Sequence, residues 1–103
     1  MNTLGELATL IRSKNAGPFW LTFDILFDDP AHYERVWSSG VISPASIAQL
    51  YGFAQEDIIL LGHRRALAIK ISVPRPRVQG DIGESDMYAG QQYAPLVDIW
   101  IPN

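Results

Sequence analysis

The sequence contains no cysteine and only two histidines, and just 18% of its 103 residues are charged. Without cysteine the chain has no disulfide framework, no thiolate metal site and no cysteine nucleophile. No apolar run reaches the roughly 18 residues that a membrane-spanning helix needs. The N-terminal segment also lacks the basic start and the apolar stretch of a signal peptide. We therefore expect a cytoplasmic protein without a membrane partner.

Basic residues are few as well, because eight Lys and Arg stand against eleven Asp and Glu, for a net charge of −3. A general nucleic-acid binder normally carries the opposite sign, so we expect no nucleic-acid partner. Hydrophobic residues make up 48% of the chain, which is typical of a globular protein. The length suits a single domain over residues 1–103 with one modest core.

Alternating side chains predict the strands. In residues 19–27 every second side chain is large and apolar, which is typical of a strand with one face against a core. Further strands are predicted at 57–61, 66–73 and 96–101. Residues 4–11 fit a helix and a strand equally well, and residues 12–18 are predicted as a loop because they contain Asn, Gly and Pro.

Capping residues predict two consecutive helices in the middle of the chain. Asp29 caps the first helix and Gly40 ends it, while Ser43 caps the second helix and Gly52 ends that one. The buried face of the second helix is predicted to contain Ile47, Leu50 and Tyr51. A long loop then follows residue 73, and residues 86–94 are predicted as a short helix closed by Pro95.

This order of elements predicts an α+β fold. Helices on one face of a mainly antiparallel sheet make a two-layer sandwich. A ferredoxin-like βαββαβ arrangement with one added strand fits the order best.

The second face of such a sheet is unusually apolar. It is predicted to carry two tryptophans, small apolar residues and few charges; Trp20, Thr22, Leu26 and Trp100 are the predicted interface residues. Apolar faces of this kind mark binding surfaces, so we expect another chain here, either a different protein or a second copy. The alternative is that loops or the N-terminal segment cover the face. Asp24 and Lys70 lie on the same face, where they either pair with each other or act as acid and base.

Two stiff polar segments predict an anion site. The first contains Arg12, Ser13, Lys14 and Asn15, and the second contains Arg75 and Arg77 between prolines. Guanidinium, ammonium and hydroxyl groups of this kind bind a carboxylate or a phosphate. The alternative is a solvated turn for the first segment and a stiff strand exit with solvated arginines for the second.

The remaining polar groups carry weaker signals. Asp81, Glu84 and Asp86 lie close together but lack the spacing of a calcium-binding loop, so helix capping is favoured over a metal site. In an enzyme, Asp86 would be a further candidate for a catalytic acid or base. Neither His32 nor His63 has a partner that would indicate a catalytic triad, and we expect no metal and no cofactor.

Several segments resemble a family of uncharacterised proteins of roughly 100 residues, the domain of unknown function numbered 4387. The most specific pieces are RSKNAGPFWLTFDILFDD at 12–29, AIKISVPRP at 68–76 and DMYAGQQYAPL at 86–96. A fainter similarity links the chain to the C-terminal domain of AtuA-type proteins, named for acyclic terpene utilisation. The resemblance implies a ferredoxin-like fold, a strand over residues 4–11 and association with a larger AtuA-like chain.

Three functions follow as hypotheses. The first is an accessory subunit that docks on an AtuA-like chain and helps to bind an organic acid or an acyl-CoA intermediate. The second is an autonomous small lyase or isomerase that acts on a carboxylate. The third is a structural homo-oligomer without catalysis.

Overall fold

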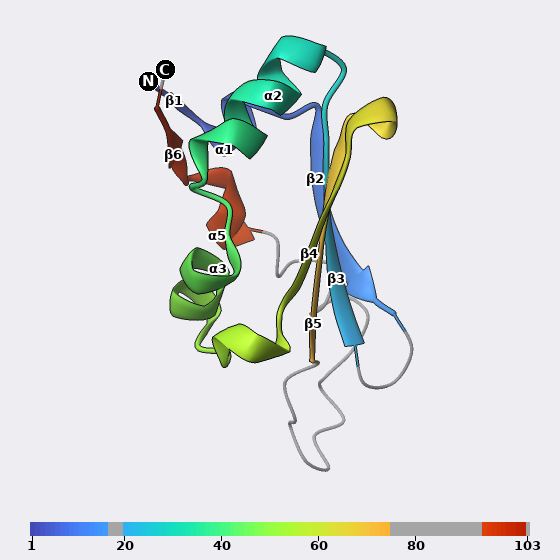
Figure 1. The fold of residues 1–103 in the computed structure, drawn as a ribbon, viewed down its shortest axis with the longest axis vertical. Helices are drawn as coiled ribbons and strands as arrows, with labels where there is room; N and C mark the ends of the chain where they lie inside the picture. The colour runs from blue at the N-terminus through green and yellow to red at the C-terminus, as the bar shows by residue number, and fades with distance from the viewer. Residues whose placement is uncertain (17–19, 75–93, 103) are drawn as a thin grey trace.

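A four-stranded antiparallel sheet dominates the computed structural model, which describes residues 1–16, 20–74 and 94–102. Its strands are β2 (Leu10–Asn15), β3 (Trp20–Leu26), β4 (Ile59–His63) and β5 (Ala68–Pro74). They lie in the order β2-β3-β5-β4, and every neighbouring pair is antiparallel. Figure 1 shows this sheet nearly edge-on, with the helices gathered on one side of it.

Strand β3 confirms the predicted alternation. Leu21, Phe23 and Ile25 are at most 2% exposed and form the core side of the strand. The register places Phe23 opposite Ile71 of β5, whose alternate residues are also fully buried. The two central strands thus provide the base on which the helices pack.

Helices α2 (Pro30–Ser39) and α3 (Pro44–Tyr51) form where the capping residues predict them. Asp29 accepts a hydrogen bond from the backbone N–H of Ala31 at 2.9 Å, and Ser43 accepts one from that of Ser46 at 3.1 Å. Ile47 is buried as predicted, but Leu50 is 41% exposed, because it borders an open hollow instead of the core.

The two ends of the described chain pair with each other. Strand β1 (Asn2–Thr3) runs antiparallel to β6 (Trp100–Ile101) in a separate two-stranded sheet, as Figure 1 shows. The strand predicted over residues 4–11 is wrong at its start, because a Thr3 capping box begins a helix, α1 (Leu4–Leu7).

The C-terminal segment also differs from its prediction. Residues 94–97 form a short helix, α5 (Ala94–Val97), so only Trp100–Ile101 of the predicted strand over 96–101 is extended. Pro95 stands at the second position of α5, where proline fits a first helical turn without losing a hydrogen bond. Residues 86–93 of the predicted helix lie outside the described residues.

The hairpin of β4 and β5 starts later than predicted. A 3₁₀ turn, η1 (Gln55–Asp57), precedes β4, and a second one, η2 (Arg64–Ala66), connects β4 to β5. Leu67 takes a left-handed backbone with a φ of 52°. Its carbonyl accepts a hydrogen bond from the N–H of Phe27 at 2.8 Å, which ties the turn to the end of β3.

Aromatic rings fill the space between the sheet and the helices. Tyr33 stacks on Trp37 within α2, with ring centroids 6.3 Å apart. Tyr51 of α3 lies 5.1 Å from Phe23 of β3, and burial raises the pKa of its phenol. The Tyr51 ring also lies beside Phe53, so it joins the aromatic cluster under the sheet.

The fold is α+β with antiparallel sheets, as predicted. The four-stranded sheet is built as ββααββ, which is two hairpins joined by two helices. This order does not confirm the ferredoxin-like βαββαβ arrangement, in which a helix follows the first strand.

Candidate functional site: the outer face of the sheet

The side of the four-stranded sheet that faces away from the helices is called the outer face. Alternation along each strand defines it, and the register aligns its residues in rows. It consists of Leu10, Arg12 and Lys14 from β2, Trp20, Thr22, Asp24 and Leu26 from β3, Ala68, Lys70, Ser72 and Pro74 from β5, and Ile59, Leu61 and His63 from β4.

A row of charged residues crosses the middle of the outer face. Arg12, Asp24 and Lys70 stand opposite one another on β2, β3 and β5. The Nε of Arg12 lies 3.2 Å from Oδ2 of Asp24, and the Asp24 side chain is only 16% exposed. Asp24 thus forms its ion pair with Arg12, although Lys70 is the cross-strand neighbour that the sequence suggested.

Positive charge exceeds negative charge on this face. Lys14 lies one row from Arg12 and Lys70, so three cations surround the single carboxylate of Asp24. The chain as a whole carries a net charge of −3. An acidic surface or a small anion would therefore be attracted to the outer face in particular.

Large apolar side chains lie beside the charged row, and Leu61 stands at its β4 end opposite Lys70. Leu10, Trp20, Ile59 and Leu61 are between 40% and 48% exposed. They belong to β2, β3 and β4, whereas β5, which lies between β3 and β4, contributes Lys70 and Ser72. Large apolar side chains exposed on one face are typical of a binding surface.

The predicted polar loop is in fact a strand, and this divides its residues between two faces. Arg12 and Lys14 lie on the outer face, but Ser13 is only 5% exposed and faces the core opposite Phe23. Asn15 lies two residues after Ser13 and therefore on the same side of the sheet, away from Arg12 and Lys14. The four residues therefore cannot surround one anion together.

Three of the four predicted interface residues share the outer face. Trp20 is 40% exposed and Leu26 is half-buried, whereas Thr22 is only 4% exposed and offers little surface to a partner. Trp100 is 59% exposed but belongs to β6, which pairs with β1 and not with this sheet. Its placement on the same face is wrong, because residues 94–97 turn into a helix first.

Asp86, Arg75 and Arg77 lie outside the described residues. Pro74, the residue before Arg75, stands opposite Trp20 at the end of the sheet where β2 also ends with Asn15. Strands β2 and β5 therefore end at the same end of the sheet.

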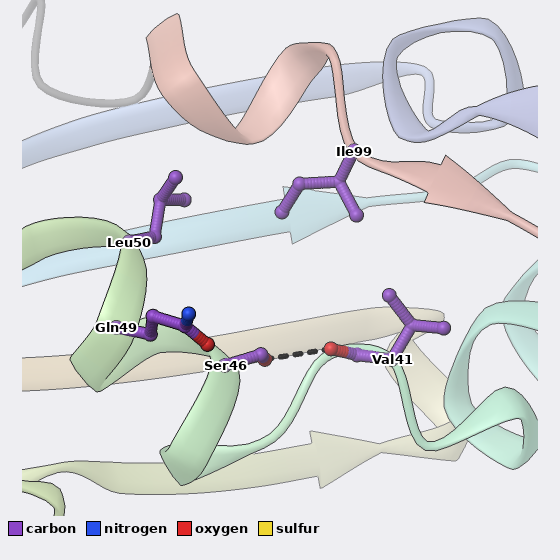
Figure 2. A pocket seen from close by; sticks show the side chains of 5 residues that line it. All are labelled: Val41, Ser46, Gln49, Leu50 and Ile99. Atoms are coloured by element: carbon purple, nitrogen blue, oxygen red, sulfur yellow. Dashed lines mark hydrogen bonds between the residues drawn. The ribbon is translucent and has the colours of Figure 1, made fainter.

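An open hollow of about 390 Å³ lies between α3 and the segment that leads into β6. Figure 2 shows Val41, Leu50 and Ile99 around it, together with Gln49 and Ser46. The hydroxyl of Ser46 donates to the carbonyl of Val41 at 2.6 Å, so it serves the start of α3. None of the described residues that line the hollow has an ionisable side chain.

A second hollow, of about 270 Å³, is bordered by Arg35, Ser38, Ser39 and Pro102. Arg35 is a residue that the sequence did not single out. Its Nε donates to the carbonyl of Pro102 at 2.9 Å, and its Nη2 donates to Oδ1 of Asn2 at 2.9 Å and to the carbonyl of Ile101 at 3.3 Å. These partners are distant in sequence, so no local pattern could have found them.

The two histidines lie apart from each other. Nε2 of His32 is 3.7 Å from Oδ2 of Asp29 at the start of α2, and His63 ends β4 on the outer face. Among residues 1–16, 20–74 and 94–102, no three His, Asp or Glu side chains gather as metal ligands.

Comparison with known families settles the relationship of the chain. The model of the Domain of unknown function (DUF4387) matches residues 4–100. The chain belongs to the DUF4387 family. No match to this DUF4387 protein was found among curated proteins or among solved structures. Within the part of the chain that the structure describes, no helix has the length and apolar character needed to cross a bilayer.

Proposed function

We propose that this DUF4387 protein is an accessory subunit that docks through its outer face on a larger AtuA-like chain in the cytoplasm. The exposed apolar side chains of that face carry the proposal. Leu10, Trp20, Ile59 and Leu61 remain 40–48% exposed, while the core side of the central strands β3 and β5 is buried. A partner that covered them would remove this apolar surface from water.

Charge supports a role in substrate binding at the same surface. The partner chain would supply the reacting groups, and Lys14 and Lys70 would attract the carboxylate or phosphate of an organic acid or an acyl-CoA intermediate. Arg12 contributes less, because Asp24 already accepts from its guanidinium at 3.2 Å. In the same proposal, Arg75 and Arg77 would also help to bind the anion.

An autonomous lyase or isomerase has weaker support. Asp24 and Lys70 would be its acid and base, but the Asp24 carboxylate is held in an ion pair on a sheet surface. Neither Asp24 nor Lys70 lines the hollow beside α3 or the hollow beside Arg35. A group that works by proton transfer needs a site that also holds the substrate.

Two exposed tryptophans make a matched test of docking. Trp20 lies on the outer face with 40% exposure, while Trp100 lies on β6 with 59% exposure. Each would be changed to Ala, and affinity for the co-expressed AtuA-like chain would be measured by calorimetry. We expect Trp20→Ala to weaken binding at least about tenfold, as buried interface tryptophans do. Trp100→Ala should leave the affinity unchanged.

Two outcomes would reject this function. Equal losses for both tryptophan variants would place the contact elsewhere, provided that both variants keep the unfolding temperature of the parent. Turnover of a carboxylate substrate by the purified small chain alone would favour the autonomous enzyme.

A further inference from the structure

Strand β4 forms an open edge of the four-stranded sheet. It is the last strand in the order β2-β3-β5-β4, and within the described residues it pairs only with β5. Ile59 and Leu61 are 47% and 48% exposed, and Gly62 and His63 are exposed too. The backbone N–H and C=O groups along such an edge are available to another strand.

The opposite edge is protected in a way that β4 is not. Strand β2 carries Arg12 and Lys14, and charged residues on an edge strand discourage pairing with another chain. Strand β4 reads Ile-Leu-Leu-Gly-His and contains neither Lys, Arg nor Pro. Of the two edges, β4 is therefore the one suited to strand addition.

The charges on either side of β4 indicate what would pair with it. Glu56 and Asp57 precede the strand in η1, and Arg64 and Arg65 follow it in η2. All four residues are exposed. Arg64 donates to Glu34 of its own chain at 3.0 Å. Arg65 is therefore the better candidate for an ion pair with a second copy. One end of the strand is thus acidic and the other is basic.

This pattern is complementary to itself in the antiparallel direction. We propose that two copies of the chain pair through β4 about a two-fold axis and form one continuous eight-stranded sheet. With Leu61 at the axis, Ile59 of one copy faces His63 of the other, and Asp57 comes near Arg65. A two-fold interface uses the same patch on both partners, which this charge pattern satisfies.

The proposed dimer uses the β4 edge, so it involves the outer face only at Ile59, Leu61 and His63 and leaves Leu10 and Trp20 uncovered. It therefore goes beyond the docking function and does not depend on it. The two outer faces would lie side by side on the joined sheet, so a dimer would present two docking surfaces to AtuA-like chains. The experiments below use the small chain by itself, and their result is separate from the test of docking.

Sedimentation of the isolated chain over a range of concentrations tests whether it dimerises through β4. We expect the mass to rise from 11.5 kDa to twice that value as concentration increases. Leu61→Lys should raise the dissociation constant at least about tenfold, because it places like charges opposite each other at the axis. Leu10→Lys is the matched control, since Leu10 is 45% exposed on β2. Leu10→Lys and Trp20→Ala should both dimerise as the parent does.

A charge exchange tests the antiparallel arrangement. Asp57→Arg and Arg65→Asp should each weaken self-association, because each sets two like charges against each other. Mixing the two variants should restore a dimer that contains one copy of each. Sedimentation with one variant fused to a larger tag would identify the mixed species.

The proposal fails if the parent chain stays monomeric throughout the range. It also fails if Leu10→Lys or Trp20→Ala dissociates the dimer as strongly as Leu61→Lys, since the contact would then lie on the outer face. A mixture of charge variants that remains monomeric would exclude the antiparallel pairing. Circular dichroism of each variant would show that the fold is retained.

Discussion

At the scale of single residues, Glu6 shows how one side chain can fix the start of an element. Its Oε1 accepts a hydrogen bond from the backbone N–H of Thr3 at 2.8 Å, and its own N–H donates to the Thr3 hydroxyl at 3.3 Å. The backbone hydrogen bond from Thr3 favours the ionised carboxylate and so lowers the pKa of Glu6 below its usual 4.5.

This shift makes the stability of the fold depend on pH. The contribution of Glu6 is complete above the unfolded pKa of about 4.5 and is lost as the pH falls through the lower folded pKa. Glu6→Gln keeps an acceptor oxygen but cannot titrate. We therefore expect its unfolding temperature to fall less steeply than that of the parent below about pH 4.5. Thermal melts at a series of pH values measure both slopes, and equal slopes would contradict the assignment.

At the scale of elements, the contact of α1 with α5 depends on the absence of a side chain at Gly5. A Cβ atom built at Gly5 would stand 2.6 Å from Cγ1 of Val97 and 3.2 Å from its carbonyl oxygen. These distances are too short for carbon and oxygen neighbours. The two short helices can approach each other because glycine occupies this position, although glycine lowers helix propensity.

Gly5→Ala should accordingly destabilise the protein by about 1–3 kcal/mol, as overpacking of a tight contact does. The gain in helix propensity, up to about 1 kcal/mol, would offset part of this cost. Urea denaturation of Gly5→Ala, Val97→Ala and the double variant measures how far the effects of the two substitutions on the free energy of unfolding depend on each other. The Gly5→Ala step should cost less once Val97 is shortened; equal costs in both backgrounds would place the strain elsewhere.

Elements with local signals could be predicted from the sequence, and those defined by distant partners could not. The capping side chains of Asp29 and Ser43 bond to backbone N–H groups within three residues, so the sequence predicts both central helices correctly. Residues 12–15 carry polar side chains but become a strand because β3 pairs with them over their whole length. The same distinction applies to the candidate site. Alternation along β3 predicts that Trp20 and Asp24 lie on the outer face. The ion pair of Asp24 with Arg12 cannot be predicted in this way, because it requires that residues 10–15 form a strand beside β3.

At the scale of the whole molecule, Arg35 connects α2 to both ends of the described chain. Its guanidinium donates to Asn2 of β1 and to the carbonyls of Ile101 and Pro102. Hydrogen bonds from a charged donor contribute roughly 1.5–3 kcal/mol. This side chain therefore helps to hold the two-stranded sheet against the helix layer, together with the fully buried Ile101.

We expect Arg35→Ala to lower stability by about 2 kcal/mol, or roughly 10 °C in unfolding temperature. Arg35→Lys should recover only part of this, because an ammonium cannot reach three acceptors in the geometry of a guanidinium. Arg64→Ala is the control, since its ion pair with Glu34 at 3.0 Å is exposed and should matter little. Calorimetric melts compare the three variants; similar losses for Arg35 and Arg64 would contradict a special role for Arg35.

The pairing of β1 with β6 also has a consequence for how the chain folds. Asn2 and Ile101 are partners, so nearly the whole sequence lies within the loop that this contact closes. The β2–β3 and β4–β5 hairpins close far shorter loops and lose less chain entropy when they form. We expect the hairpins to form early in folding and the two-stranded sheet to form last. In the native protein the same sheet would be the first part to open.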